Sequence, residues 1–293
     1  LKSALSLNLL YFRFLAALIT VTAILHINAQ PNEQIVLCTY NQGFFYTCTT
    51  TEMAIVTDFL PIRFIGNHLP GFNDSHVQQI WAGLSQSRFH HVLSKEFVQH
   101  FENLIEIDVG WSNMTRINGD AFERCDKLEV ISIQGNRFLT EIPSGLFKNC
   151  QILQRLEISS NDLRTLQAEI FEGLSNLDEL SLGWNPIENL PSGVFRNLTS
   201  LRILRMESCR LNVLNPEWFI GLVSLTSVNL FSNELTHIPR GTFNDSQSLH
   251  TLRLHSNRIN RLDSFGRLPV LHIFDIGSNR MGAIEPDFFS NHP

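Results

Sequence analysis

Leu177-Asp-Glu-Leu-Ser-Leu-Gly-Trp-Asn-Pro-Ile-Glu-Asn-Leu-Pro-Ser-Gly-Val-Phe195 is the stretch of sequence that decides the fold. Its apolar residues and Asn185 follow the pattern LxxLxLxxNxL. The block starts are separated by 24, 25, 24, 24, 24, 24 and 22 residues and lie at Leu104, Leu128, Leu153, Leu177, Leu201, Leu225, Leu249 and Leu271. A degenerate block begins at Val77, 27 residues before Leu104. A period of this length over most of a chain predicts a stack of structural repeats.

Each block predicts one short strand followed by a buried turn. The period-two alternation in Leu180-Ser-Leu182 points the leucines to one side of the strand. One unit cannot close a core alone, but stacked parallel units bury their leucines continuously. Asparagine recurs after each strand, where buried backbone groups need partners, so we expect a ladder of side-chain amides. This column holds Asn161, Asn185, Cys209, Asn233 and Asn257.

Two further apolar columns complete the predicted core. The aliphatic column contains Ile142, Leu166, Leu190, Leu214, Ile238, Leu262 and Ile284. The aromatic column contains Phe122, Phe147, Phe171, Phe195, Phe219, Phe243 and Phe289, with Phe265 after the short repeat. We interpret this phenylalanine stripe as core, and it explains why the chain has 22 Phe but only 3 Tyr.

These blocks resemble the typical 24-residue extracellular leucine-rich repeat over about residues 77–293. A short Cys-containing segment followed by such repeats is similar to secreted and receptor proteins of insects. The resemblance implies an α/β solenoid, a horseshoe with a parallel concave β-sheet and an irregular or short helical convex side. It also implies function by binding, with innate immune recognition or cell adhesion as settings by analogy.

The start of the chain predicts export. Lys2 and Arg13 precede 12 uncharged, mostly apolar residues, and Ala29 then places a small residue before Gln30. This order is typical of a secretory signal peptide, here residues 1–29. A membrane anchor is the alternative, but it would need about 20 apolar residues. We therefore expect a signal peptide (1–29), an N-terminal capping region (30–76) and about nine repeats (77–293), the last one truncated, in an extracellular protein.

Charge and glycosylation motifs point to the same environment. Without the leader, 20 basic and 28 acidic residues give a formal charge of −8. An acidic protein without basic runs lacks the footprint of a nucleic-acid binder, so we expect no nucleic-acid partner. Four sequons predict N-linked glycans at Asn73, Asn113, Asn197 and Asn244.

The five cysteines predict two disulfides and one free thiol. Two strand-like runs flank Asn41-Gln-Gly43, and a hairpin centred on Gly43 would place Cys38 opposite Cys48 and Tyr40 opposite Tyr46. Cys125 and Cys150 occupy equivalent positions in adjacent repeats, so a bridge is expected in an oxidising compartment, with two separate buried thiols as the alternative. Cys209 replaces asparagine in the ladder and is expected to be a buried free thiol.

Motifs of catalysis and metal binding are missing from the sequence. It contains no HExxH, GxxxxGK[ST], GxSxG or CxxC. Five of the 11 histidines fall between His68 and His100, and we interpret them as surface residues of an N-terminal flank: His68, His76, His90, His91 and His100. We therefore expect no enzyme, no cofactor and no metal site.

The outward residues between the leucines should cover the concave sheet and bind a protein ligand or co-receptor. Tryptophan and arginine are frequent anchors of protein interfaces, whereas a tryptophan that only covers its neighbours is the alternative reading. The candidate ligand-binding residues are Trp81, Glu106, Asp108, Trp111, Arg155, Glu157, Glu179, Trp184, Arg205, Glu207, Phe231, Arg253 and His255.

Two classes of function remain open at this point. The first is an extracellular recognition protein or receptor or adhesion ectodomain with a protein ligand on the concave face. The second is a structural or matrix protein that associates with itself, and either class is compatible with homo- or hetero-oligomers. The chain stops at Pro293, where the next strand is due, so we interpret it as a fragment and leave membrane attachment open.

Overall fold

The computed structural model describes residues 34–42, 45–49, 53–54, 62–65, 67–82, 91–284 and 288. The predicted signal peptide (1–29) lies outside these residues, as do His90 and Phe289. Within the described ranges, no helix combines the length and apolar character needed to cross a membrane.

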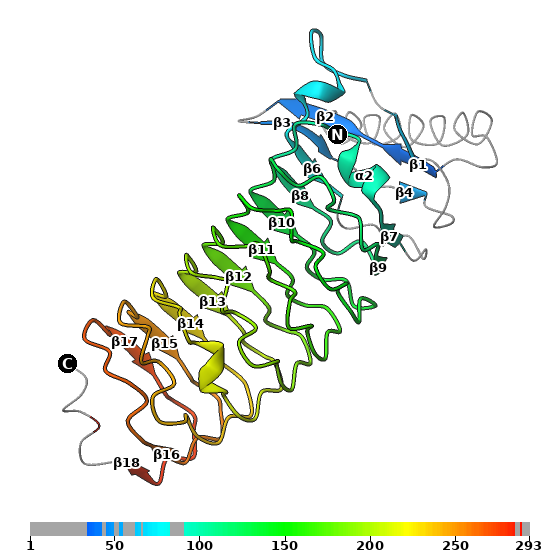
Figure 1. Cartoon of the computed structure of the whole chain (residues 1–293). Coiled ribbons are helices and arrows are strands. Elements are labelled where there is room, and N and C mark those ends of the chain that lie inside the picture. The colour runs from blue at the N-terminus through cyan, green and yellow to red at the C-terminus, as the bar shows by residue number, and fades with distance from the viewer. Residues whose placement is uncertain are drawn as a thin grey trace, which may run out of the picture.

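The chain forms a solenoid whose short strands stack side by side in one sheet of 11 strands (Figure 1). All neighbours in this sheet are parallel except the first pair, β2 and β3. The repeat strands contain three residues each and are β6 (Gln79–Trp81), β8 (Glu106–Asp108), β10 (Val130–Ser132), β11 (Arg155–Glu157), β12 (Glu179–Ser181), β13 (Ile203–Arg205), β14 (Ser227–Asn229), β15 (Thr251–Arg253) and β17 (Ile273–Asp275). The predicted leucine-rich-repeat solenoid with a parallel concave sheet is confirmed.

The other side of the solenoid is irregular and contains little helix. It carries the two-stranded pairs β7 (His91–Leu93) with β9 (Met114–Ile117), and β16 (Arg261–Leu262) with β18 (Ala283–Ile284). The described helical segments are the 3-10 turns η1 (Asp74–His76) and η2 (Pro216–Trp218) and the five-residue helix α2 (Lys95–Gln99).

The first strands lie at the N-terminal end of the solenoid (Figure 1). β2 (Thr39–Gln42) and β3 (Tyr46–Thr49) form a hairpin, and β3 continues the main sheet by pairing with β6. A small separate sheet has the order β4 (Met53–Ala54), β1 (Gln34–Leu37) and β5 (Ile62–Ile65).

The hairpin register differs from the prediction by two residues. Tyr40 lies opposite Cys48 and Gln42 lies opposite Tyr46, because the loop between the strands has three residues and not one. A shift of two residues keeps every side chain on its original face of the sheet. Cys38 and Cys48 are therefore diagonal neighbours on one face and not directly opposed residues, and they still form the predicted disulfide, with their Cα atoms 5.2 Å apart.

The other two cysteine predictions are confirmed. Cys125 and Cys150 are joined by a disulfide between adjacent turns, with a Cα–Cα distance of 4.7 Å. Cys209 is a buried free thiol. Burial raises the pKa of Cys209 to about 12 because the thiolate would lose its hydration. Hydrogen bonds from the backbone of Asn185 and Ile187 lower this pKa, but burial has the larger effect.

The amide ladder is present as predicted. In each complete rung the amide nitrogen donates to two carbonyl oxygens; that of Asn185 donates to Leu182 at 2.8 Å and to Ile158, one turn back, at 2.9 Å. Its Oδ1 accepts from the backbone N–H groups of Asn161 and Leu163, both at 3.2 Å. The ladder thus joins each turn to the preceding one and satisfies backbone groups that would otherwise be buried without partners.

The predicted apolar columns form the core, with one exception at the C-terminal end. In the aromatic column, the phenylalanines from Phe122 to Phe243, together with Phe265, are buried. Ile284 was expected in the aliphatic column, but this was wrong: it is 46% exposed, because it lies in the last described turn and no described residue beyond covers it. Phe288 is buried and its ring lies 5.4 Å from that of Phe265.

Candidate binding surface

The candidate surface is built by the strands of the main sheet and the turn that follows each of them. The middle residue of a repeat strand, such as Ile107, Leu156 or Leu180, is fully buried. Its two neighbours therefore face outward, because side chains alternate along a strand. The strand residues of the predicted surface are Trp81, Glu106, Asp108, Arg155, Glu157, Glu179, Arg205 and Arg253.

An ion network lies at the centre of this surface. Glu179 on β12 pairs with Arg155 on β11, whose Nε is 3.3 Å from the carboxylate, and with Arg205 on β13. The Glu179 side chain is only 17% exposed, whereas both arginines reach solvent. Two cations share one carboxylate, and Glu157 and Glu207 lie beside them, so the surface presents both signs of charge to a ligand.

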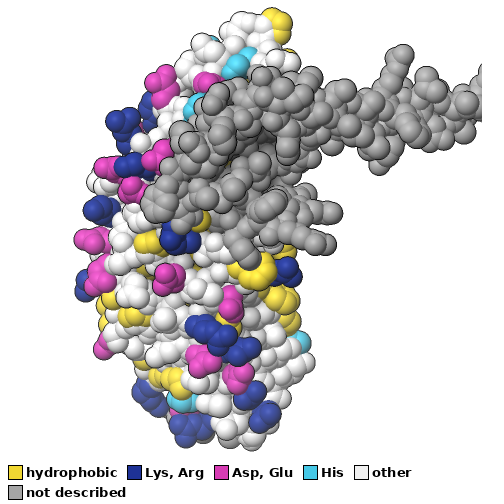
Figure 2. Space-filling view, turned by 90° about the vertical axis from the view of Figure 1, so that its right-hand side faces the viewer, with side chains coloured by type: hydrophobic (Ala, Val, Ile, Leu, Met, Phe, Trp, Pro, Cys, Tyr) yellow, Lys and Arg dark blue, Asp and Glu magenta, His cyan; other side chains and the backbone are white. Residues whose placement is uncertain are grey.

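The acidic and polar neighbours are also held in place. Glu157 accepts from the hydroxyl of Ser159, and Glu207 accepts from the side-chain amide of Asn229 at 3.0 Å. These contacts orient the groups before any partner arrives, which lowers the entropy lost on binding. Figure 2, which is turned by 90° from Figure 1, shows that basic and acidic side chains are interspersed along that side of the solenoid as well.

The tryptophans lie differently from the expectation that they occupy solvent-facing strand positions. Trp81 is on β6, but Trp111 and Trp184 follow their strands, in turns where they have φ of 54° and 58°. Equivalent turns place Gly135 or serine at this left-handed position, which bulky residues rarely adopt. Trp111 and Trp184 are 54% and 60% exposed. Two large exposed side chains in strained backbone are consistent with a binding role.

Trp111 is supported by its neighbouring turn, whereas the fourth tryptophan belongs to the core. The Trp111 indole lies against Gly135, so the reading of a tryptophan that covers its neighbour is partly correct for this residue. Trp218 is fully buried, and its Nε1–H donates to the carbonyl of Leu190 at 3.2 Å.

Towards the C-terminal end, the surface gains an aromatic pair. Phe231 stacks on His255, with ring centroids 5.6 Å apart. The two ring nitrogens of His255 lie 2.7 Å from the hydroxyl of Ser256 and 3.2 Å from that of Ser278. Arg253 is exposed and has no ion pair within the described part of the chain.

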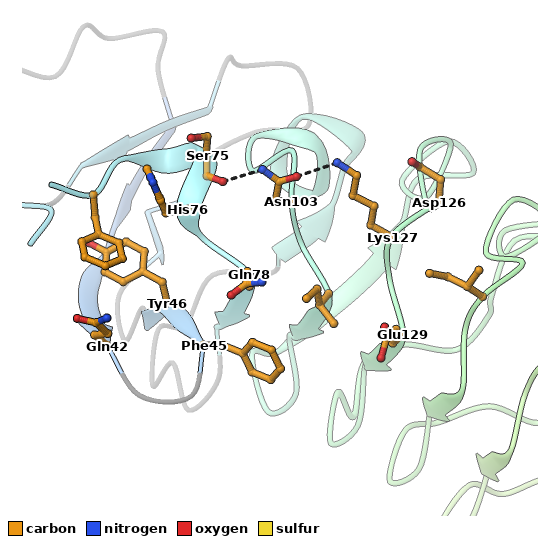
Figure 3. Close-up of a pocket in the computed structure, with 13 residues that line it drawn as sticks. Gln42, Phe45, Tyr46, Ser75, His76, Gln78, Asn103, Asp126, Lys127 and Glu129 are labelled. Atoms are coloured by element: carbon orange, nitrogen blue, oxygen red, sulfur yellow. Dashed lines mark hydrogen bonds between the residues drawn. The ribbon is translucent and has the colours of Figure 1, made fainter.

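A groove at the N-terminal end was not predicted from the sequence. It has a volume of about 610 Å³ and lies where the hairpin meets the first turns (Figure 3). One side is a chain of hydrogen bonds in which Lys127 donates to Asn103 and Asn103 donates to the carbonyl of Ser75, both at 2.7 Å. Phe45 and Ile105 provide apolar lining. No pattern in the sequence brings the hairpin and these turns together, so no signal could have revealed the groove.

Two of the clustered histidines are more ordered than the surface interpretation suggested. Asp74 accepts from Nε2 of His68 at 3.0 Å and from Nε2 of His100 at 3.2 Å, and the Tyr40 hydroxyl donates to it at 3.3 Å. Burial and the adjacent Asp74 carboxylate raise the pKa of Tyr40. Among the described residues, no group of three or more potential ligands is arranged to hold a metal ion. The network joins the hairpin, η1 and the end of α2.

Comparison with known proteins places the chain in a family. Residues 92–222 match the model of the BspA type leucine-rich repeat region, and residues 224–281 match a leucine-rich repeat model. The chain therefore belongs to the leucine-rich-repeat family. Members of this class typically act as binding modules built on an extended concave surface. No curated protein matches the sequence.

Three solved structures are similar to the chain, and the first two share its fold. A leucine-rich-repeat protein of Leptospira interrogans is 26% identical over 74% of this chain and 53% of its own, with a TM-score of 0.63. TLR13, solved in complex with ssRNA13, is 22% identical over 74% of this chain and 31% of its own, with a TM-score of 0.65. The leucine-rich repeat domain of APL1B is 22% identical over 59% of this chain and 51% of its own, with a TM-score of 0.48. The chain spans about half the length of the first of these structures and about a third of the second.

Proposed function

We propose that this chain is an extracellular protein-binding module, a recognition protein or a receptor or adhesion ectodomain, which acts by binding and not by catalysis. The observation that carries the proposal is the run of exposed Trp111, Trp184 and the Arg155–Glu179–Arg205 network along one sheet face. Aromatic and arginine anchors surrounded by oriented polar groups are typical of protein interfaces. A protein ligand or co-receptor of mixed charge fits this surface.

Export is part of the same proposal. Disulfides persist in oxidising compartments, and the structure contains two of them. A signal peptide at 1–29 and sequons at Asn73, Asn113, Asn197 and Asn244 support the same location. Innate immune recognition and cell adhesion are the settings that we consider.

The test is a binding screen with matched variants. The chain is secreted, made multivalent and applied to an array of extracellular proteins. The double variant Trp184→Ala/Arg205→Ala and the control Lys148→Ala are applied to the same array in parallel. Lys148 is exposed and distant from the concave strands in its turn. We expect each true partner to lose at least tenfold in affinity with the double variant and to keep its affinity with Lys148→Ala. Equal binding by all three proteins would refute the concave placement.

Self-association in a structural or matrix protein is the second candidate. Ile220 and Val223 favour it, because both are apolar and more than half exposed in a single turn. Sedimentation of the purified chain tests it: a dimer that Ile220→Thr/Val223→Thr abolishes, and Trp184→Ala does not, would support this function over the first.

A further inference from the structure

The turn between β13 and β14 has two exposed apolar residues at positions that are polar in five equivalent turns, whereas the turn after Phe265 has Gly266 and Pro269 there. Ile220 and Val223 are 57% and 56% exposed. The residues equivalent to Ile220 are Glu123, Lys148, Glu172, Arg196 and Asn244. Those equivalent to Val223 are Asp126, Gln151, Ser175, Thr199 and Gln247. Ile220 and Val223 thus place two exposed apolar side chains in one turn, and exposed apolar patches of protein surfaces are frequent contact sites.

A sequon lies directly beside this patch, one turn earlier. The Phe195 and Phe219 side chains are both buried in the same column, so Asn197 and Gly221 occupy equivalent positions. The hydroxyl of Ser224 donates to the carbonyl of Thr199 at 2.9 Å, which holds Val223 next to the sequon. A Cβ at Gly221, the position equivalent to Asn197 in the turn that carries the patch, would meet no atom within 4 Å, so the surface is open there.

Asn197 presents its amide better than the other three sequons. It is exposed and its side chain makes no hydrogen bond within the described residues, and Thr199 is exposed as well. Asn73 is engaged by its own turn, where Oδ1 accepts from the amide and the hydroxyl of Ser75. Asn113 is half-buried in left-handed backbone. The sequon of Asn244 ends in Ser246, which is fully buried.

We propose that Asn197 carries an N-linked oligosaccharide whose first sugars lie over Ile220 and Val223. In the secretory pathway, a transferase would form a bond from Asn197 Nδ2 to sugar C1. The bond from C1 to the phosphate of a lipid-linked oligosaccharide donor breaks, and the amide proton leaves with the released lipid diphosphate. Pyranose rings have C–H faces that can pack on the apolar side chains, while their hydroxyls stay in water.

The glycan would also cover one side of the solenoid and leave the face of the main sheet accessible to a ligand. Ile220 and Val223 precede Leu225 and lie outside the concave residues, which begin at Ser227 in that turn. A sugar chain at Asn197 therefore shields this edge against self-association and leaves the sheet face open. The inference stands independently of the ligand proposed above.

The first test is glycopeptide mass spectrometry of the chain secreted from insect or mammalian cells behind a cleavable signal. We expect glycan on at least nine in ten molecules at Asn197, and Asn197→Gln to lose the corresponding mass. Secreted protein with Asn197 unoccupied overturns the proposal, while concave-face binding could still be measured on the same protein.

The second test asks whether the sugar covers the patch. Asn197→Gln should bind at least twofold more of an apolar fluorescent dye than the glycosylated chain, and adding Ile220→Thr/Val223→Thr should remove the increase. Asn73→Gln, a lost sequon far from the patch, is the matched control and should leave dye binding unchanged. Equal dye binding by glycosylated protein and Asn197→Gln would overturn the covering role. So would a dimer of the glycosylated chain that Ile220→Thr/Val223→Thr abolishes.

Discussion

The indole of Trp111 lies directly over Gly135 of the next turn: a Cβ added to Gly135 would collide with Cδ2 of the indole. Both residues hold the left-handed position of their turns, with φ of 54° and 73°. Trp111 is exposed and has a left-handed backbone, and its ring rests on Gly135. Any other residue at position 135 would displace the ring. The position of the Trp111 ring therefore depends on the absence of a side chain at Gly135.

Gly135→Ala should destabilise the protein through both strain and contact. The left-handed φ costs about 1–2 kcal/mol for alanine, and displacing the indole adds about 1–3 kcal/mol. Chemical denaturation measures the sum. Gly221→Ala is the matched control, because its φ is 80° but nothing lies within 4 Å of the added Cβ. If the two variants lose the same stability, Trp111 does not depend on Gly135.

Cys209→Asn should stabilise the protein by completing the ladder. The Cys209 thiol donates to the carbonyls of Leu182 and Glu207 at 3.6 and 3.8 Å, whereas the amide of Asn233 donates to two carbonyls over shorter distances. One restored bond is worth about 1 kcal/mol, or about 2–4 °C in Tm for a domain of this size. Thermal unfolding measures it, with Cys209→Ala as the variant that lacks any polar group. A Tm for Cys209→Asn at or below that of Cys209→Ala contradicts the prediction.

The raised pKa of Cys209 predicts a loss of stability at alkaline pH. The thiol ionises near 9 when the chain is unfolded but at about 12 in the fold, where burial opposes the thiolate. The unfolded state therefore loses a proton first, and stability falls as pH rises from 9 to 12, by at most about 1.4 kcal/mol per pH unit. Unfolding of the wild type and Cys209→Asn at pH 8 and pH 11 isolates this effect, because their other groups titrate alike. A constant difference between the two proteins would disprove it.

Asp74→Asn should loosen the contact between the N-terminal hairpin and the first turns. One carboxylate accepts from His68, His100 and Tyr40, and an amide would turn its NH2 group towards one of these donors. We expect a loss of about 1–3 kcal/mol and faster hydrogen exchange of the Leu69 amide, which donates to the Tyr46 hydroxyl at 3.0 Å.

The same substitution should lower the pKa of Tyr40. Burial is the largest cause of the raised pKa, and the Asp74 carboxylate is the next largest. Ultraviolet titration of the phenolate measures this shift. Asp126→Asn, an exposed carboxylate one turn away from the network, is the control and should change neither quantity. An unchanged Tyr40 titration in Asp74→Asn would contradict the assigned contact.

The sequence by itself determined the solenoid, its repeat strands, the amide ladder and both disulfides. These features depend on residues that recur at a fixed period, so neighbours in space are equivalent positions in successive blocks. The predicted register of the hairpin that contains Cys38 and Cys48 was wrong by two residues. The sequence pattern could not distinguish a loop of one residue from a loop of three, because both put each side chain on the same face of the sheet.

Only the tertiary structure decided the features that break the repeat. The Asp74 network and the groove join segments that have no periodic relation, and the tilt of Trp111 onto Gly135 depends on backbone torsion in two turns. The proposed role of the exposed pair Ile220 and Val223 depends on the position of Asn197, one turn earlier in the solenoid. A repeat pattern predicts what each turn shares with its neighbours, whereas the differences between turns become visible only once the side chains meet in space.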